Sequence, residues 1–139
     1  MQIAGIITEY NPLHMGHLLQ LERTRQLLGP DKIIGVSAHT VEEALAAQAA
    51  GADYLGTGAA FVTGTKTDAK PISRETIRAI CAAVDIPVVA IGGITRDNIL
   101  ELKGCGLDGV AVVSALFAQK DVKAAAEELL ALSNEMASR

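Results

Sequence analysis

Five short apolar runs mark this 139-residue chain, and longer segments with a helical spacing separate them. The runs do not alternate apolar with polar residues, which predicts strands buried on both faces, as in a parallel sheet covered by helices. They cover residues 3–7, 33–36, 54–61, 88–91 and 110–113. The pattern therefore predicts an α/β fold of five βα units built on a parallel sheet.

The segments between the runs have recognisable helix starts. Thr40 and Glu43 have the spacing of a capping box, and Gly51 follows at the expected end of that helix. The other helices are expected to begin near residues 16, 73, 95 and 121, with the first ending near residue 28. No linker or low-complexity segment interrupts the pattern, so residues 1–139 are expected to form a single domain.

The chain also contains an internal repeat. Shifted by 55 residues, "IIGVSAHTVEEALAAQAAGADYLG" lies over "VVAIGGITRDNILELKGCGLDGVA", with Thr40, Gly51 and Asp53 on Thr95, Gly106 and Asp108. Quasi-symmetric βα units are typical of a (β/α)8 barrel, which usually needs about 250 residues. We therefore expect half of a TIM barrel, with a flavodoxin- or Rossmann-like open sheet as the alternative.

Composition narrows the possible partners. The net charge of −4 provides no basic surface for nucleic acid, and no apolar stretch approaches the roughly 20 residues that span a membrane. Cys81 and Cys105 have neither a CxxC spacing nor a nearby histidine, so we expect two thiols in a reducing cytoplasm. A cytoplasmic protein that binds neither nucleic acid nor membrane is expected.

Two glycines follow the fourth apolar run directly. Gly92 and Gly93 precede Thr95, the expected start of a helix, and Ser114 comes at the end of the next run. Backbone N–H groups at such a turn, together with the helix dipole, can bind an anion. The simpler alternative is a tight turn that needs glycine for its conformation.

A polar loop follows the third apolar run. Its sequence, "TGTKTDAK" (residues 63–70), offers hydroxyl groups and a lysine. On a strand-end loop these groups could hold a second anion or a product carbonyl. A solvated loop without such a role is the alternative.

From about residue 27 to residue 132 the chain resembles the C-terminal half of thiamine phosphate synthase, a TIM-barrel enzyme. The resemblance rests on "GPDKIIGVSAHTVEEALAAQAAGADYLGTGAAF", "TGTKTDAKPIS", "IPVVAIGGIT" and "GLDGVAVVSALF". It implies a reaction that joins hydroxymethylpyrimidine diphosphate to thiazole phosphate and releases diphosphate with the help of Mg²⁺. The implied substrate- and phosphate-binding residues are Ser37, Thr63, Thr65, Lys66, Gly92, Gly93, Val113 and Ser114.

The match departs from the family in two ways. The loop commonly reads Pro-Thr-Ser-Thr-Lys, whereas Val62 and Gly64 here replace the proline and the serine. The pyrimidine pocket and the Mg²⁺-binding aspartates belong to the family's other half. Asp53 and Asp108 lie at helix-to-strand turns and are expected to shape those turns. We therefore expect weak or absent synthase activity for this chain alone, with no metal or other cofactor bound by the chain itself.

The first 28 residues suggest a different origin. "AGIITEYNPLHMGHLLQLERTR" is similar to the start of HxGH nucleotidyltransferases, most closely the tRNA(Met) cytidine acetate ligase group, in which the counterparts of His14 and His17 steady the ATP phosphates. No second phosphate motif of that superfamily is evident. We interpret residues 1–28 as a nucleotidyltransferase-like βα unit joined to a half-barrel over residues 29–139. An engineered chimera without activity and an HxGH-type nucleotidyltransferase are the alternative functions.

An open half-barrel should associate with itself. A bare sheet face would expose an apolar patch larger than about 400 Å², which soluble monomers seldom tolerate. A two-fold partner offering the same patch would bury it, so we expect a homodimer. The alternative is that the first helix crosses the bare face and gives a doubly wound monomer.

Overall fold

A computed structural model of the chain describes residues 15–62 and 71–138. Four strands form one parallel sheet in the order β1-β2-β3-β4. The strands are β1 (Gly35–Ser37), β2 (Tyr54–Thr57), β3 (Val88–Ile91) and β4 (Gly109–Ala111). The helices are α1 (Met15–Leu28), α2 (Val41–Ala49), α3 (Arg74–Ala83), the 3₁₀ helix η1 (Ile99–Leu102), α4 (Ser114–Phe117) and α5 (Val122–Ala137). The strand predicted over residues 3–7 lies outside the described residues.

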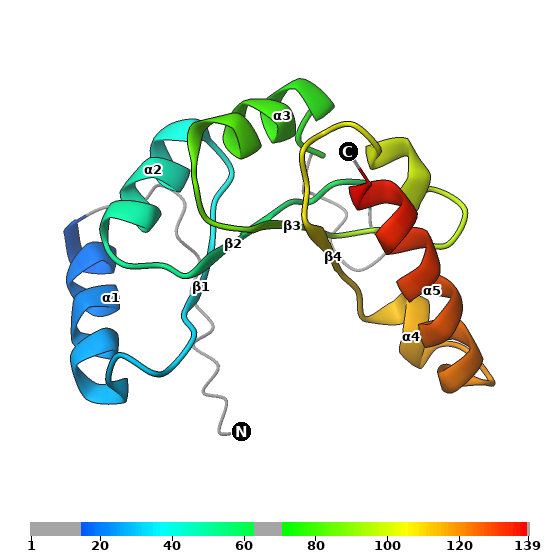
Figure 1. Cartoon of the computed structure of the whole chain (residues 1–139), viewed down its shortest axis with the longest axis horizontal. Helices are drawn as coiled ribbons and strands as arrows, with labels where there is room; N and C mark the ends of the chain where they lie inside the picture. Colours follow the sequence, from blue (N-terminus) through cyan, green and yellow to red (C-terminus); the bar gives the residue numbers. More distant parts are fainter. Residues whose placement is uncertain (1–14, 63–70, 139) are drawn as a thin grey trace.

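The sheet curves into an arch whose outer side carries the long helices (Figure 1). α1 lies beside α2 in this outer layer, and Leu21 of α1 belongs to the same buried cluster as Ile34 and Ala47. No helix of the described residues crosses the inner side of the arch. The described residues therefore form a curved parallel sheet with helices on its outer side, as in a (β/α) barrel.

The core lies between the sheet and the outer helices. Val36, Leu55 and Val88 are paired across three neighbouring strands and are all buried, facing the helices. Tyr54 and Ile91 point to the inner face and remain 39% and 42% exposed. The prediction that both strand faces are buried is thus wrong for the described residues, because helices cover one face alone.

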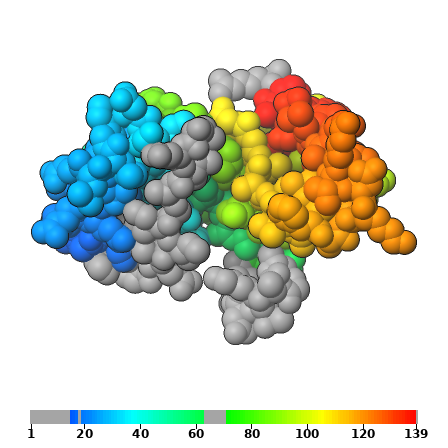
Figure 2. Space-filling model, turned by 90° about the horizontal axis from the view of Figure 1, so that it is seen from below, coloured from blue at the N-terminus to red at the C-terminus, as the bar shows by residue number. Residues whose placement is uncertain are grey.

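The inner face forms the hollow of the arch. In Figure 2, seen from below, the blue atoms of α1 and the orange atoms of α4 and α5 form two flanks, and the green atoms of the central strands lie between them.

In the described part of the chain, no helix is long and apolar enough to cross a membrane.

Side-chain caps confirm most of the expected helix starts. Ser73 Oγ accepts a hydrogen bond from the Thr76 N–H, and Asp121 Oδ1 accepts one from the Ala124 N–H. Thr40 Oγ1 likewise accepts from the Glu43 N–H. The Glu43 carboxylate, however, accepts from the His39 N–H at 2.7 Å, one residue before the N–H that a reciprocal capping box uses.

The helix predicted to begin at residue 95 is largely absent. The chain forms turns over residues 96–98 and then the four-residue η1. The Asn98 side chain binds the backbone of Thr95 and Gly93, which turns the chain before a helix can form. Gly104 then ends the segment with a φ of +78°.

β2 also ends earlier than predicted, at Thr57. Beyond it the chain bends onto the end of β3, where the Ala60 N–H donates to the Ile91 carbonyl at 2.9 Å. Gly58 permits this approach, because a Cβ at this residue would lie 2.1 Å from the Ile91 carbonyl oxygen. The segment after residue 57 is therefore a loop.

The internal repeat is visible at the two helix-to-strand turns. Gly51 and Gly106 have φ values of +92° and +86°. Asp53 exchanges two hydrogen bonds with Ile34, at 2.7 and 2.8 Å, and Asp108 does the same with Val88, at 2.9 Å for both. The two aspartates shape these turns, as predicted.

The register corrects the ungapped alignment of the repeat. A shift of 55 residues places Ile34 on Val89, whereas the structure makes Val88 its counterpart. One additional residue therefore lies between β3 and β4 relative to the segment between β1 and β2.

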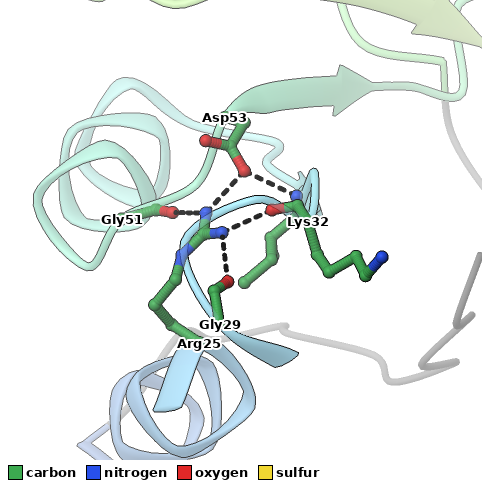
Figure 3. Close-up of polar contacts among 6 residues, drawn as sticks. Arg25, Gly29, Lys32, Gly51 and Asp53 are labelled. Atoms are coloured by element: carbon green, nitrogen blue, oxygen red, sulfur yellow. Dashed lines mark hydrogen bonds and ion pairs between the residues drawn. The ribbon is translucent and has the colours of Figure 1, made fainter. Parts of the chain in front are cut away.

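Arg25 connects helix α1 to the segments before β1 and before β2 (Figure 3). Its guanidinium donates to the carbonyls of Lys32 and Gly51 and to Asp53 Oδ2, the last at 2.5 Å. Desolvation raises the pKa of Asp53, but hydrogen bonds from the Ile34 N–H and from Arg25 outweigh it and hold this pKa below its usual value. α1 is thereby fastened to both β1 and the α2–β2 turn.

Candidate anion site at the carboxyl edge of the sheet

The carboxyl ends of the four parallel strands lie along one edge of the arch (Figure 1). Ligands of α/β proteins usually bind at this edge, because the strand-to-helix loops converge there. The described candidate residues Ser37, Gly92, Gly93, Val113 and Ser114 are all at or just beyond these strand ends. Thr63, Thr65, Lys66 and His14 lie outside the described residues.

The glycines after β3 are required by conformation and by packing. Gly92 and Gly93 have φ values of +97° and +66°. A Cβ at Gly93 would lie 2.8 Å from the carbonyl oxygens of both Phe61 and Val62, and one at Gly92 would lie 2.8 Å from Ala59 Cα. A side chain at either glycine would displace the loop after β2.

The loops after β2 and β3 are interlocked. Besides the bond from Ala60 to Ile91, the Phe61 N–H donates to the Gly92 carbonyl at 3.0 Å. The segment that leads into the polar loop of residues 63–70 therefore rests on the glycine turn. These contacts place the bases of two predicted anion loops side by side.

Asn98 is a residue of this edge that sequence reasoning missed. Its Nδ2 donates to the Gly93 carbonyl at 2.9 Å, and its Oδ1 accepts from the Thr95 N–H at 2.8 Å. Its spacing of three residues after Thr95 is the pattern from which this contact could have been anticipated. The glycine turn is held by a side-chain amide and is not followed by an α-helix, so the helix-dipole contribution expected there is not available.

Ser114 lies farther beyond the end of its strand than predicted. β4 ends at Ala111, and Ser114 is the first residue of α4, with Val113 as the residue before it. Both residues are exposed, and Val113 is 68% exposed. Ser114 is therefore exposed at the start of the short helix that follows β4.

Ser37 ends β1 with its side chain on the exposed face of the sheet. Two residues later, His39 Nδ1 lies 3.3 Å from Glu43 Oε2, the oxygen that also accepts the His39 N–H. The imidazole is thus oriented by a carboxylate at the same edge. Sequence reasoning used Glu43 only as a helix cap and did not single out His39.

Thr57 is the polar residue of the described core that lacks a partner. It ends β2 and is fully buried, and its hydroxyl oxygen has no hydrogen bond. In register it is paired with Ala90, on the helix-facing side of the sheet. Its hydroxyl therefore points into the core and not toward the candidate site.

The remaining candidate groups lie elsewhere. His17 is the third residue of α1, in the outer layer, and it has an interaction of its own within the chain. Cys81 and Cys105 are free thiols, as expected. Desolvation, together with the nearby Asp108 and Cys105, raises the pKa of Cys81 to about 11.

The arrangement defines the class of protein. A curved parallel sheet with helices on its outer side, and with glycine and serine loops at the carboxyl edge, is a segment of a (β/α) barrel. A family model described as thiamine monophosphate synthase matches residues 11–116. The chain belongs to this family. The match begins within the segment that we compared with nucleotidyltransferases.

Relatives agree with this assignment. Thiamine-phosphate synthase of Ruminiclostridium cellulolyticum is 57% identical over 106 residues, covering 76% of this chain and 50% of that protein. The Clostridium tetani enzyme of the same name is 50% identical over 124 residues, covering 88% of this chain and 59% of that protein. The chain thus spans about half the length of these relatives.

A solved structure has the same fold. Thiamine phosphate pyrophosphorylase from Pyrococcus furiosus superposes with a TM-score of 0.74 at 45% identity, covering 85% of this chain and 56% of that one. The chain therefore covers little more than half of that structure.

Proposed function

We propose that this chain forms the thiazole-phosphate-binding part of a thiamine phosphate synthase. The reaction joins hydroxymethylpyrimidine diphosphate to thiazole phosphate in thiamine biosynthesis. The observation that supports the proposal most is the alignment of Ser37, Gly93 and Ser114 along one edge of a half-barrel from this family. We expect this function in the cytoplasm, where the free thiols stay reduced.

The candidate residues divide into two groups under this proposal. Gly92, Gly93, Val113 and Ser114 would surround the phosphate of the thiazole substrate, with backbone N–H groups and one hydroxyl as donors. In the second group, Ser37 would contact the diphosphate, and Thr63, Thr65 and Lys66 would belong to a loop that contacts both the thiazole phosphate and the diphosphate.

The chain by itself should turn over slowly or not at all. The reaction implies Mg²⁺ to neutralise the leaving diphosphate. The described residues contain no cluster of three or more acidic, histidine or cysteine side chains that could hold a metal. Asp53 and Asp108 are bonded at the opposite edge of the sheet. The metal therefore does not fit the described residues, and we assign it no ligand.

Titration followed by amide chemical shifts tests the phosphate site. Inorganic phosphate and then thiazole phosphate should move the amides of Gly93 and Ser114, and Ser114→Ala should weaken binding several-fold. Ser133→Ala is the matched control, because Ser133 lies beside Gly109 at the opposite edge. Unmoved shifts at millimolar phosphate would refute the phosphate site and favour a chain whose role is only to fold.

A synthase assay tests the proposed lack of turnover. Purified chain, both substrates and Mg²⁺ should yield little or no thiamine phosphate. Robust product formation would show that the pyrimidine half-site is present, and the proposal of an inactive half-barrel would then be wrong.

A fused origin for residues 1–28 is a second proposal, motivated by "NPLHMGHLL". The family match from residue 11 and the anchoring of α1 by Arg25 count against it. If the motif works as in nucleotidyltransferases, ATP should shift amides near His17, and both His14→Ala and His17→Ala should abolish the effect. No shift with ATP would remove nucleotidyl transfer from consideration.

We also propose a homodimer formed through the inner face. Exposed apolar side chains lie on this face and at its carboxyl edge, namely Tyr54, Ile91, Val113 and Phe117. A two-fold partner would bury them. Sedimentation at several protein concentrations should show a dimer, and a single species at the monomer mass would contradict it.

A further inference from the structure

Asn98 uses both ends of its side-chain amide within one loop. Its Nδ2 donates to the Gly93 carbonyl, while its Oδ1 accepts from the Thr95 N–H. The two bonds, at 2.9 and 2.8 Å, span the loop from the glycine turn to the start of the turn before η1. A single side chain thus ties Asn98 to both Gly93 and Thr95.

The donor half acts on the peptide that follows Gly93. In a trans peptide the C=O and the N–H point in opposite directions. A Gly93 carbonyl held by Asn98 Nδ2 therefore fixes the direction of the Ile94 N–H. Gly93 has a left-handed backbone, which rotates easily when nothing holds it.

The same loop supports the neighbouring one. Gly92 accepts the Phe61 N–H, and Gly93 lies against the carbonyls of Phe61 and Val62. A rotation of the Gly93 peptide would disturb the base of the loop after β2. Asn98 thus lies at one end of a series of contacts that joins both strand-end loops.

We propose that Asn98 is a positioning residue for phosphate binding, and that its donor Nδ2 and its acceptor Oδ1 have different roles. The donor half orients the glycine turn for the anion, and the acceptor half caps the turn before η1 and stabilises the fold. This inference rests on the proposed phosphate site and adds a residue that contacts no ligand itself.

Asn98→Asp separates the two halves, because a carboxylate keeps the acceptor for Thr95 and loses the donor for Gly93. We expect its affinity for inorganic phosphate to fall at least fivefold, with a urea midpoint close to that of the wild type. Asn98→Ala loses both bonds and should lower affinity and stability together.

The added negative charge needs its own control. The double variant D97N/N98D has the net charge of the wild type, and Asp97 is an exposed neighbour with 87% of its side chain accessible. Its affinity should stay as low as that of N98D. Recovery to the wild-type value would show that charge alone weakens binding and would overturn the inference.

Amide shifts without ligand provide an independent measurement. In N98D the shifts of Gly93, Ile94 and Phe61 should change, whereas those near Gly51 should not. Unchanged affinity in N98D beside a lower urea midpoint would mean a purely structural role and would overturn the inference. If the wild type binds no phosphate, the proposed site and this inference both fail. If the wild type binds phosphate and N98D binds it equally well, the inference alone fails.

Discussion

The two βα units of the repeat agree at one edge of the sheet and differ at the other. At the helix-to-strand turns, Gly51 and Asp53 repeat as Gly106 and Asp108, with the same conformation and the same pair of hydrogen bonds. At the strand-to-helix turns, the first unit proceeds from Ser37 directly to a capped α-helix. The second inserts a glycine turn clamped by Asn98 and forms only a short 3₁₀ helix.

The shared edge serves the fold alone, whereas the divergent edge serves the fold and also carries the candidate site. The shared edge satisfies its buried backbone groups with fixed carboxylates, which is what a fold needs wherever a strand begins. The divergent edge has exposed hydroxyls and two consecutive left-handed glycines, Gly92 and Gly93, on strand-end loops, where ligands commonly approach. Substitutions at the two edges should therefore have different consequences.

The largest effect is expected at the divergent edge, from Gly93→Ala. The new Cβ would clash with two carbonyl oxygens in addition to the strained φ, so the free energy of unfolding should fall by about 2–4 kcal/mol. Gly104→Ala is the control, with a similar φ but no atom within 4 Å of the new Cβ, and should lose about 1 kcal/mol. Equal losses in urea denaturation would show that φ strain alone matters.

Asp53→Ala should have the next largest effect, at the shared edge. The change removes the acceptor of the Ile34 N–H and one of the acceptors of the Arg25 guanidinium, which should cost about 1–2 kcal/mol at neutral pH. The Asp53 side chain is 43% exposed, so solvent limits the loss. Urea denaturation measures it, and a neutral result would show that water replaces the carboxylate.

Acid should reduce the difference in stability between the wild type and Asp53→Ala. Because the folded-state pKa of Asp53 is lowered from its ordinary value of 3.8, its contribution is present above that value. The contribution is lost as the pH falls through the still lower folded pKa. The gap between wild type and Asp53→Ala should shrink between pH 5 and the acid limit of folding, and a constant gap would contradict the assignment.

Thr57→Val is expected to have a smaller effect on stability, and in the opposite direction. Valine has nearly the same shape and removes a buried hydroxyl that has no partner, so stability should rise by about 1 kcal/mol. A loss of stability in urea would show that the hydroxyl is hydrogen-bonded in solution.

The smallest effect on stability is expected from the ionisation of Cys81, and it should appear only at alkaline pH. With its pKa near 11, this thiol should react slowly with a disulfide reagent at pH 8 and quickly after unfolding. Because the folded pKa exceeds the ordinary value of 9.0, stability should decline slightly as the pH rises from 9 toward 11. Fast labelling of the native protein would contradict the raised pKa.

Local patterns in the sequence predicted much of this fold. Ser73 and Asp121 begin their helices as expected, because a cap depends on a few adjacent residues. Tyr54 and Ile91 were misjudged because burial depends on which elements cover a strand face, and apolar runs do not contain that information.

The candidate site was predicted less completely. Gly92 and Gly93 lie at a strand end as the spacing indicated, and Ser37, which the family resemblance suggested, ends β1 at the same edge. Asn98 and His39 were missed because their partners, the Gly93 carbonyl and the Glu43 carboxylate, are set by loop conformation. Whether the site residues bind phosphate stays a prediction.

Arg25 has a consequence for how the molecule could be recombined or redesigned. Its guanidinium is supplied by the first helix, but three of the groups that it satisfies belong to later segments, around Lys32, Gly51 and Asp53. A foreign helix grafted before residue 29 would remove the guanidinium from these acceptors unless it carried an arginine at the same position, although Asp53 would keep its bond from the Ile34 N–H. A crossover within residues 15–53 should therefore cost the least stability when this arginine is kept.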